Sequence, residues 1–181
     1  MLARAEGGEL AHDAAAVDLA ETLRCAWRLV EEAARARRLQ AHWSVTDGLA
    51  ARADEELLRM VAGNLLENAA AYAPPGSNIH ISAAAEGDAV CLSVTNDAPG
   101  ITEHDVDHLF DRFWRKDRSR AEAGLHAGLG LSLCRRLVQL MDGTIGASTS
   151  HGRLTLWLRL ARVRLSAAAA ATAEPQRGLA R

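Results

Sequence analysis

Three polar residues recur at every fourth position in the segment NLLENAAAY: Asn64, Asn68 and Tyr72. In a helix this spacing places them on one ridge, while the residues between them are mostly apolar. Asparagine is a mediocre helix former, and burying its amide without partners costs a few kcal/mol, so the ridge faces either a ligand or open water. A carboxamide oxygen is a hard ligand of the kind that Mg²⁺ accepts beside phosphate oxygens. The spacing therefore predicts either a magnesium–phosphate site or a solvated helix face.

A second polar group follows an alternating apolar run, in Thr95–Ile101 (TNDAPGI). A strand that ends in Pro-Gly lets the backbone approach a flat ligand closely, and Asn96 or Asp97 can hydrogen-bond the edge of a base. The same residues suit a simple tight turn, which accounts well for Asp-Ala-Pro-Gly. Taken alone, this motif favours the turn over the base contact.

Glycines precede a third helical segment, in Gly124–Leu131 (GLHAGLGL). Glycines before a helix N-terminus expose backbone N–H groups, and the helix dipole favours an anion there. Walker-A spacing is missing from the sequence and no GxGxxG follows a strand, which excludes P-loop and Rossmann nucleotide sites. The glycine pattern indicates an anion site of another kind, although it is weak evidence by itself.

Two helices with clear start signals would carry and support these residues. Asp18 is the expected N-cap of a helix that runs to about Leu39, with Glu21 at the capping-box spacing. Asp54 caps a second helix, which contains the asparagine ridge and ends before Pro74 because proline cannot continue it. A third helix is expected to begin near Leu129, with Gly143 as its C-cap.

Strands are expected between the helices and at the end of the chain. Short runs at Trp43–Val45 and Leu49–Ala53 flank Asp47-Gly48, which is a strong hairpin signal. Alternating apolar residues predict further strands around 79–83, 90–94, 144–148 and 154–160. The expected fold is an α/β (α+β) two-layer sandwich, in which a mixed, mostly antiparallel sheet of about five strands packs on three helices. It would span residues 11–165, and the Ala-rich tail, residues 166–181, is expected to be disordered.

The composition narrows the functional class. The chain has 181 residues and a formal net charge of -2, without the basic excess that a nucleic-acid-binding protein usually shows. Its three cysteines lack CxxC spacing and indicate free thiols in a reducing compartment. No apolar run approaches the length of a membrane span, about 18 residues. We therefore expect a cytoplasmic protein with no nucleic-acid partner and no membrane segment in this chain.

Taken together and in order, the motifs resemble the catalytic ATP-binding domain of bacterial sensor histidine kinases, in the wider group shared with DNA gyrase and heat-shock-chaperone ATPases. NLLENAAAYAP resembles the N box, TNDAPGI the first glycine box, LFDRFWR the phenylalanine box and HAGLGLSLCRRLVQLMDGTI the second glycine box. The resemblance covers about residues 17–160. The phenylalanine box narrows it to the kinases, because the ATPases of the group lack that element.

The resemblance implies ATP and Mg²⁺ as ligands and gives several residues a role. Asn68 would coordinate Mg²⁺, Asn64 would lie beside the phosphates, and both would belong to the catalytic set. Tyr72 would border the nucleotide, and Asn96 stands where the family usually has an aspartate that binds the adenine amino group. The segment 102–127 would be a mobile lid over ATP. The other nucleotide-contacting residues implied by the motifs are Gly100, Ile101, Phe110, Arg115, Lys116, Gly128, Leu129, Gly130 and Leu131.

The resemblance also implies a reaction and its partners. Hydrolytic members of the group place a glutamate four residues before the magnesium-binding asparagine, whereas this chain has Asn64, a poor base. That difference favours phosphoryl transfer to a separate acceptor over hydrolysis. The acceptor would be a histidine on a dimerisation domain, for relay to a response regulator. None of the seven histidines here has the sequence context of that acceptor, although Met1–Gly8 resembles the last turns of such a hairpin. Residues 1–10 would then be its remnant, and homodimerisation would require the missing hairpin.

Several departures from the family pattern keep two alternatives open. Ala71 replaces a frequent Lys or Arg, Ala98 replaces a usual glycine of the first glycine box, and His126 replaces the first glycine of the second. With Asn96, Ala71 and Ala98 favour a degenerate, catalytically weak interaction module as one alternative. An anti-sigma-type serine kinase of the same superfold is the other, and the phenylalanine box argues against it.

Overall fold

The computed structural model describes residues 13–116 and 129–164. The expectations for the N-terminal remnant, for His126 and Gly128, for the later part of the lid and for the C-terminal tail lie outside the described residues. No helix in the described ranges is long and apolar enough to cross a membrane.

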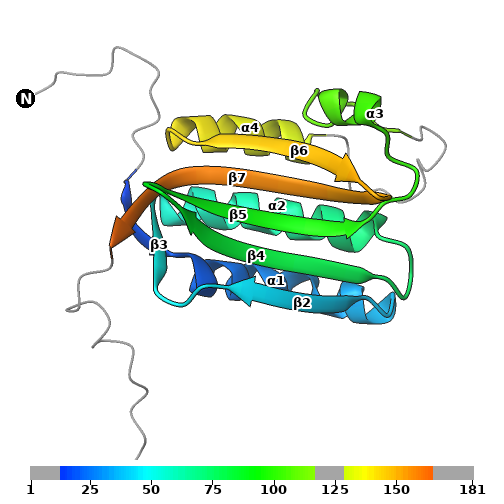
Figure 1. Ribbon diagram of the computed structural model, residues 1–181, viewed down its shortest axis with the longest axis horizontal. Coiled ribbons are helices and arrows are strands. Elements are labelled where there is room, and N and C mark those ends of the chain that lie inside the picture. The colour runs from blue at the N-terminus through cyan, green and yellow to red at the C-terminus, as the bar shows by residue number, and fades with distance from the viewer. Residues whose placement is uncertain (1–12, 117–128, 165–181) are drawn as a thin grey trace, which may run out of the picture.

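Eleven elements follow one another along the described chain (Figure 1). Strand β1 and helix α1 are followed by two strands, β2 and β3, and by helix α2. A hairpin of β4 and β5 leads through the short helix α3 to α4, β6 and β7. Their bounds are β1 Ala15–Asp18, α1 Leu19–Ala36, β2 Gln40–Val45, β3 Leu49–Ala53, α2 Glu55–Tyr72, β4 Asn78–Glu86, β5 Ala89–Asp97, α3 Glu103–His108, α4 Gly130–Leu140, β6 Thr144–Ser150 and β7 Arg153–Arg164.

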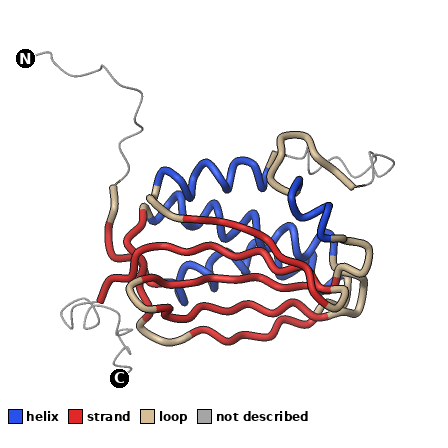
Figure 2. The backbone as a smooth tube through the Cα atoms, turned by 45° about the horizontal axis from the view of Figure 1, so that its top comes forward, coloured by secondary structure: helices blue, strands red, loops and turns tan. Residues whose placement is uncertain are grey.

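The strands form one sheet, and the helices gather on one of its faces (Figure 2). The strand order is β1-β3-β7-β5-β4-β2, and β6 also pairs with β7. Only β2 and β4 run parallel, and the other pairs are antiparallel. The expected two-layer, mostly antiparallel sandwich is confirmed. The described residues contain seven strands where about five were expected, and β1, which is only four residues long, is the strand that no alternating segment of the sequence indicated.

The hairpin predicted at Asp47-Gly48 is wrong. Gly48 does adopt the left-handed conformation of a turn, with φ 67°. The strands on either side of it nevertheless separate: β2 pairs with β4 at one edge of the sheet, and β3 pairs with β1 and β7 near the other. β3 is buried at four of its five positions, whereas β2 is largely exposed. An inner strand and an edge strand bury different amounts of surface, and this tertiary preference overrides the local turn signal.

The helix starts agree with the sequence. The Asp18 carboxylate accepts from the Glu21 N–H at 2.9 Å, and the Asp54 carboxylate accepts from the N–H groups of Glu56 and Leu57. Each carboxylate satisfies helix N–H groups that have no partner within the helix, which stabilises the helix by about 1 kcal/mol. α1 ends at Ala36, earlier than the expected Leu39, because Arg38 turns into the left-handed region at φ 58°.

The core lies between the sheet and the three long helices. Alternate residues of β4, β5 and β7 point to the helices and are almost fully buried, as the alternating pattern predicted. α2 occupies the centre of the helical layer and contacts α1, α4 and β5. The apolar face of α2 is fully buried through Leu58, Val61, Ala62, Leu65, Leu66 and Ala69.

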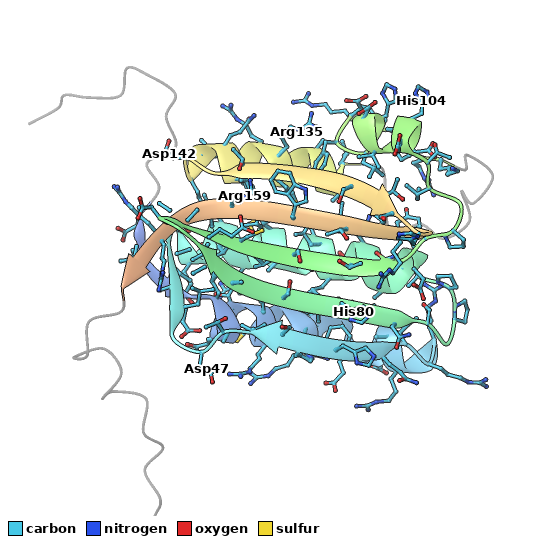
Figure 3. All side chains as sticks on the ribbon, in the orientation of Figure 1. Asp47, His80, His104, Arg135, Asp142 and Arg159 are labelled. Carbon is cyan, nitrogen blue, oxygen red and sulfur yellow. The ribbon has the colours of Figure 1, made fainter. Side chains whose placement is uncertain are left out.

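The connection from α4 to β6 depends on a close approach of two backbones. The residue with positive φ here is Asp142 (φ 54°, labelled in Figure 3), and not the predicted cap Gly143. Gly143 donates its N–H to the Val138 carbonyl at 2.9 Å. A Cβ added to Gly143 would lie 2.7 Å from the carbonyl oxygen of Arg159 in β7. The glycine is therefore required by contact with the sheet.

We predict opposite effects of alanine at two glycines. Gly143→Ala is expected to lower the free energy of unfolding by about 1–3 kcal/mol, because the β7 backbone cannot move away easily. Gly63→Ala, inside α2 where nothing lies within 4 Å of the added Cβ, is expected to raise it by up to about 1 kcal/mol through helix propensity. Urea unfolding of both variants measures the difference. An equal change in the free energy of unfolding for the two variants would contradict the close approach of Gly143 to the β7 backbone.

Candidate functional site

A cavity of about 460 Å³ opens between α2, the ends of β5 and β7, the segment after β5 and the start of α4. The sequence motifs that were far apart along the chain meet around it. Ten of the residues singled out from the sequence line this cavity: Asn64, Asn68, Tyr72, Asn96, Gly100, Ile101, Arg115, Lys116, Gly130 and Leu131.

The asparagine ridge of α2 forms one wall of the cavity. Asn64 and Asn68 are half-buried, and Tyr72 is 44 % exposed. The Asn64 amide donates to the Met60 carbonyl at 2.9 Å within the helix, which leaves its oxygen directed at α4. A Cβ on Gly130 would lie 2.7 Å from that Asn64 oxygen. The start of α4 therefore approaches the tip of the Asn64 side chain closely, and the ridge lines the cavity instead of an open helix face.

Asn96 lines the cavity, and its side chain carries a buried acceptor that no described residue satisfies. It is 1 % exposed, and its amide nitrogen donates to the Asp97 carbonyl at 2.9 Å. Its side-chain oxygen is buried and has no partner among the described residues. An acceptor left in this state costs about 1–3 kcal/mol, which a donor on a bound ligand would recover. The sequence left Asn96 and Asp97 as alternatives, and only Asn96 lines the cavity.

The backbone after Asn96 makes the tight turn that the sequence indicated. The Ile101 N–H donates to the Ala98 carbonyl at 3.0 Å, and the Ala98 N–H donates to the Gly152 carbonyl at 2.7 Å. Ala98 is buried and lines the cavity. The turn and the cavity-lining asparagine therefore coexist in this motif.

The first N–H groups of α4 have no side-chain partner among the described residues. Its N-cap residue is Leu129, and no side chain of the described residues caps the helix. The first N–H groups of a helix have no partner within it, and together with the helix dipole they attract anions. Leu129 itself is 43 % exposed and does not line the cavity. The N-terminus of α4 lies beside Asn64, as the Gly130 contact requires.

The phenylalanine-box segment lines the cavity through other residues than the expected Phe110. Phe110 is 4 % exposed, does not line the cavity, and lies under the Arg135 guanidinium of α4 (labelled in Figure 3) at 4.6 Å from the ring centre. Leu109 and Trp114 line the cavity in its place. Phe113 is 69 % exposed and has φ 63°. Phe110 therefore joins this segment to α4 by a cation–π contact, and the apolar wall comes from its neighbours.

Lys116 is already paired at the rim of the cavity. Its ammonium donates to the Gly100 carbonyl and to the Asp105 carboxylate. Asp105 also accepts from the backbone and side chain of Thr102, completing the capping box of α3. The hydrogen bond from Lys116, followed by those from Thr102, lowers the pKa of Asp105 to about 2. Lys116 thus connects the last described residues before position 117 to the start of α3.

Sequence reasoning missed several cavity residues. Arg37 reaches the cavity from the end of α1, and no local signal in the sequence pointed to it. The others are neighbours of the motifs or of the turn: Glu67, Ala73, Pro74, Pro75, Pro99 and Leu154. The apolar residues Leu109 and Trp114 stood out in a charged segment, and that contrast was the signal that could have identified them.

The Asp105 contact predicts a specific acid sensitivity. Because the pKa of Asp105 is about 2 in the folded protein and ordinarily 3.8, its contribution to stability is present above pH 4 and is lost as the pH falls towards 2. Asp105→Asn is expected to remove this part of the acid dependence, measured as the thermal midpoint between pH 5 and pH 2.5. Asp107→Asn, an exposed position of the same helix, is the control. Parallel pH profiles for wild type and Asp105→Asn would contradict the assignment.

Comparisons with known proteins identify a family for this chain and solved structures with the same fold. The model of the family described as "Histidine kinase-, DNA gyrase B-, and HSP90-like ATPase" matches residues 53–164, which is more than half of the chain. The signal transduction histidine-protein kinase BaeS of Escherichia coli is 34 % identical over 149 residues, covering 82 % of this chain and 32 % of its own. The probable sensor protein PcoS of Escherichia coli is 33 % identical over 162 residues, covering 88 % of this chain and 34 % of its own.

Solved structures with the same fold include histidine kinase domains. The catalytic domain of histidine kinase ThkA superimposes with a TM-score of 0.73 at 24 % identity, covering 83 % of this chain and 96 % of that chain. Full-length ShkA in complex with AMPPNP superimposes with a TM-score of 0.75 at 25 % identity, covering 88 % of this chain and 33 % of that one. The chain spans about a third of the length of the curated relatives that it matches. By the family match and the order of its motifs, the chain belongs to the histidine kinase-, DNA gyrase B- and HSP90-like ATPase family.

Proposed function

We propose that this chain is the ATP·Mg²⁺-binding catalytic domain of a two-component sensor histidine kinase, and that it donates the γ-phosphoryl group of ATP to a histidine outside this chain. The observation that carries the proposal is at Asn96, a cavity-lining residue whose buried side-chain oxygen has no partner among the described residues. The asparagine ridge and the start of α4, which no described side chain caps, lie around the same cavity.

The cavity fits an adenine nucleotide. The Asn96 oxygen can accept a hydrogen bond from the adenine amino group, and the amide nitrogen of Asn96 is committed to the Asp97 carbonyl. A base with an oxygen in place of that amino group would bring two acceptors together. Ile101, Leu109, Trp114 and Leu154 supply the apolar walls that a flat base requires.

The phosphates fit at the Asn64 end of the ridge, away from Tyr72. Asn64, Gly130 and the free N–H groups of α4 lie there, and such a helix terminus binds anions. Asn68 lies between this end and Tyr72 on the same ridge, and its carboxamide oxygen is a ligand that Mg²⁺ accepts. Mg²⁺ binds few protein groups and keeps waters and phosphate oxygens, so one amide oxygen in an open cavity is a sufficient protein contribution. The ion would neutralise charge on the phosphates.

The residue at position 64 favours transfer over hydrolysis. Asn64 has no basic group that could take a proton from water, so the chain has no activated nucleophile at this position. In the proposed reaction an imidazole nitrogen attacks the γ-phosphorus, the P–N bond forms, the bond to the β-phosphate oxygen breaks and ADP leaves. The protein contributes positioning and charge stabilisation, which suffice for phosphoryl transfer.

The partners follow from the relatives. BaeS is named a histidine-protein kinase, and ThkA has been solved in complex with the response regulator protein TrrA. We accordingly assign a histidine-bearing dimerisation domain and a response regulator as partners of this chain, with a homodimer formed through the dimerisation domain. Because the reaction consumes ATP, we place the domain in the cytoplasm.

The proposal predicts that the magnesium dependence of nucleotide binding resides in Asn68. Asn68→Ala is expected to lower the affinity for a non-hydrolysable ATP analogue by roughly tenfold or more in the presence of Mg²⁺, about 1.4 kcal/mol, with little change in its absence. Calorimetric titration with and without Mg²⁺ measures this, and far-UV circular dichroism checks the fold.

Asn78→Ala is the matched control, because it removes an asparagine amide from β4, outside the cavity residues. Retained magnesium dependence in Asn68→Ala would refute the assignment of Asn68. A folded wild-type protein that binds no nucleotide would refute the kinase proposal and favour a non-catalytic interaction module.

A further inference from the structure

The end of α2 is held by a side chain from another helix. The last carbonyl groups of a helix have no partner within it, and the last turn of α2 contains no basic residue. The Arg37 guanidinium occupies this position. It donates through Nη1 to the carbonyls of Ala70 and Ala71 and through Nη2 to the carbonyl of Ala73 at 2.8 Å.

Arg37 reaches this place because the chain around it is fixed on both sides. Its backbone N–H donates to carbonyls at the end of α1, and its carbonyl accepts from the Gly76 N–H at 3.0 Å. The left-handed conformation of Arg38 then turns the chain into β2. The loop after α2 is bound a second time where the Gln40 N–H donates to the Ser77 carbonyl at 3.0 Å. The end of α1 and the loop after α2 therefore form one hydrogen-bonded corner.

This corner is also part of the cavity wall. Arg37, Tyr72, Ala73, Pro74 and Pro75 all line the cavity at the same end. A cation at the C-terminus of a helix is favoured by the helix dipole, and charge-assisted hydrogen bonds are stronger than neutral ones. The planar guanidinium can donate to three carbonyls in a fixed geometry, which a compact ammonium group on a flexible four-carbon stem cannot reproduce.

We propose that Arg37 is a positioning residue of the nucleotide site, which fixes the last turn of α2 and through it the position of Tyr72. Asn68 lies one turn earlier, where the helix is held by its own hydrogen bonds and by its packed face. Arg37 therefore acts on the end of the cavity that receives the base and ribose, and leaves the magnesium-dependent end unchanged. This role rests on the nucleotide site proposed above.

The test compares Arg37→Met with Arg37→Lys in the full chain. Arg37→Met keeps most of the side-chain stem and removes all three hydrogen bonds. It is expected to weaken the binding of adenosine and of an ATP analogue with Mg²⁺ by the same factor, about tenfold. Arg37→Lys, which keeps the charge and part of the hydrogen bonding, is expected to restore part of that loss. Arg35→Met is the matched control, because the Arg35 side chain is 78 % exposed and, among the described residues, its ion pair is with Glu31 on α1.

The losses of affinity for adenosine and for the ATP analogue distinguish a positioning role of Arg37 from a direct contact with the phosphates. A direct charge effect on the phosphates would weaken only the ATP analogue, and unchanged binding in Arg37→Met would show no role at all; either result overturns the proposal. If Arg37→Met does not fold, the same titrations are made with Arg37→Lys. This variant is expected to lose affinity for adenosine and for the ATP analogue by the same factor, which is smaller than the factor expected for Arg37→Met.

Amide hydrogen exchange gives an independent readout that needs no nucleotide. Without ligand, the variant used is expected to exchange faster at residues 70–73 and 76 than wild type, with residues 61–68 unchanged. Unchanged exchange at the corner would overturn the positioning role even if the wild type bound no nucleotide. If the Arg37 variant exchanges faster only at the corner and the wild type binds no nucleotide, Arg37 still stabilises the end of α2. That result would refute the proposed function and not the structural role of Arg37.

Discussion

The rotation of α2 about its axis is the constraint on which the rest of the site depends. One face of this helix is fully buried in the core between α1, α4 and the sheet, so the helix cannot turn without exposing Leu58, Leu65 and Leu66. Removing such side chains from a close-packed core is costly. The ridge of Asn64, Asn68 and Tyr72 therefore faces the cavity because apolar packing elsewhere on the same helix leaves it no alternative orientation.

The cavity end of the sheet carries a polar group that the folded protein leaves unsatisfied. Asn96 continues the buried row of β5, in which Val90, Leu92 and Val94 face the helices. Its position in that row makes its burial unavoidable, and its oxygen lacks a partner among the described residues. Such a group lowers the stability of the free protein and raises the affinity for a ligand with a matching donor. The Asn96 carboxamide is therefore the group that links the structure to the proposed function.

Local patterns predicted most of the elements, whereas contacts between distant segments escaped them. The caps Asp18 and Asp54 and the alternating strands depend on neighbouring residues, and the structure confirms them. The separation of β2 from β3 depends on which strand becomes an edge, and the Arg37 contact depends on a helix placed by the rest of the fold. Ordered motifs anticipated which residues surround the cavity, but they placed Phe110 in a wall that Leu109 and Trp114 form. Neither an alternating apolar pattern nor a helix cap in the sequence indicates which of these apolar side chains faces the cavity.

In the proposed site the buried oxygen of Asn96 selects a base with a donor group. Calorimetric titration can compare ATP with inosine triphosphate, in which an oxygen replaces the amino group, for wild type and for Asn96→Leu. The wild type is expected to bind ATP at least about tenfold more tightly than inosine triphosphate. Asn96→Leu is expected to lose this preference while remaining folded. Equal affinity of the wild type for the two nucleotides would show that Asn96 does not select the base.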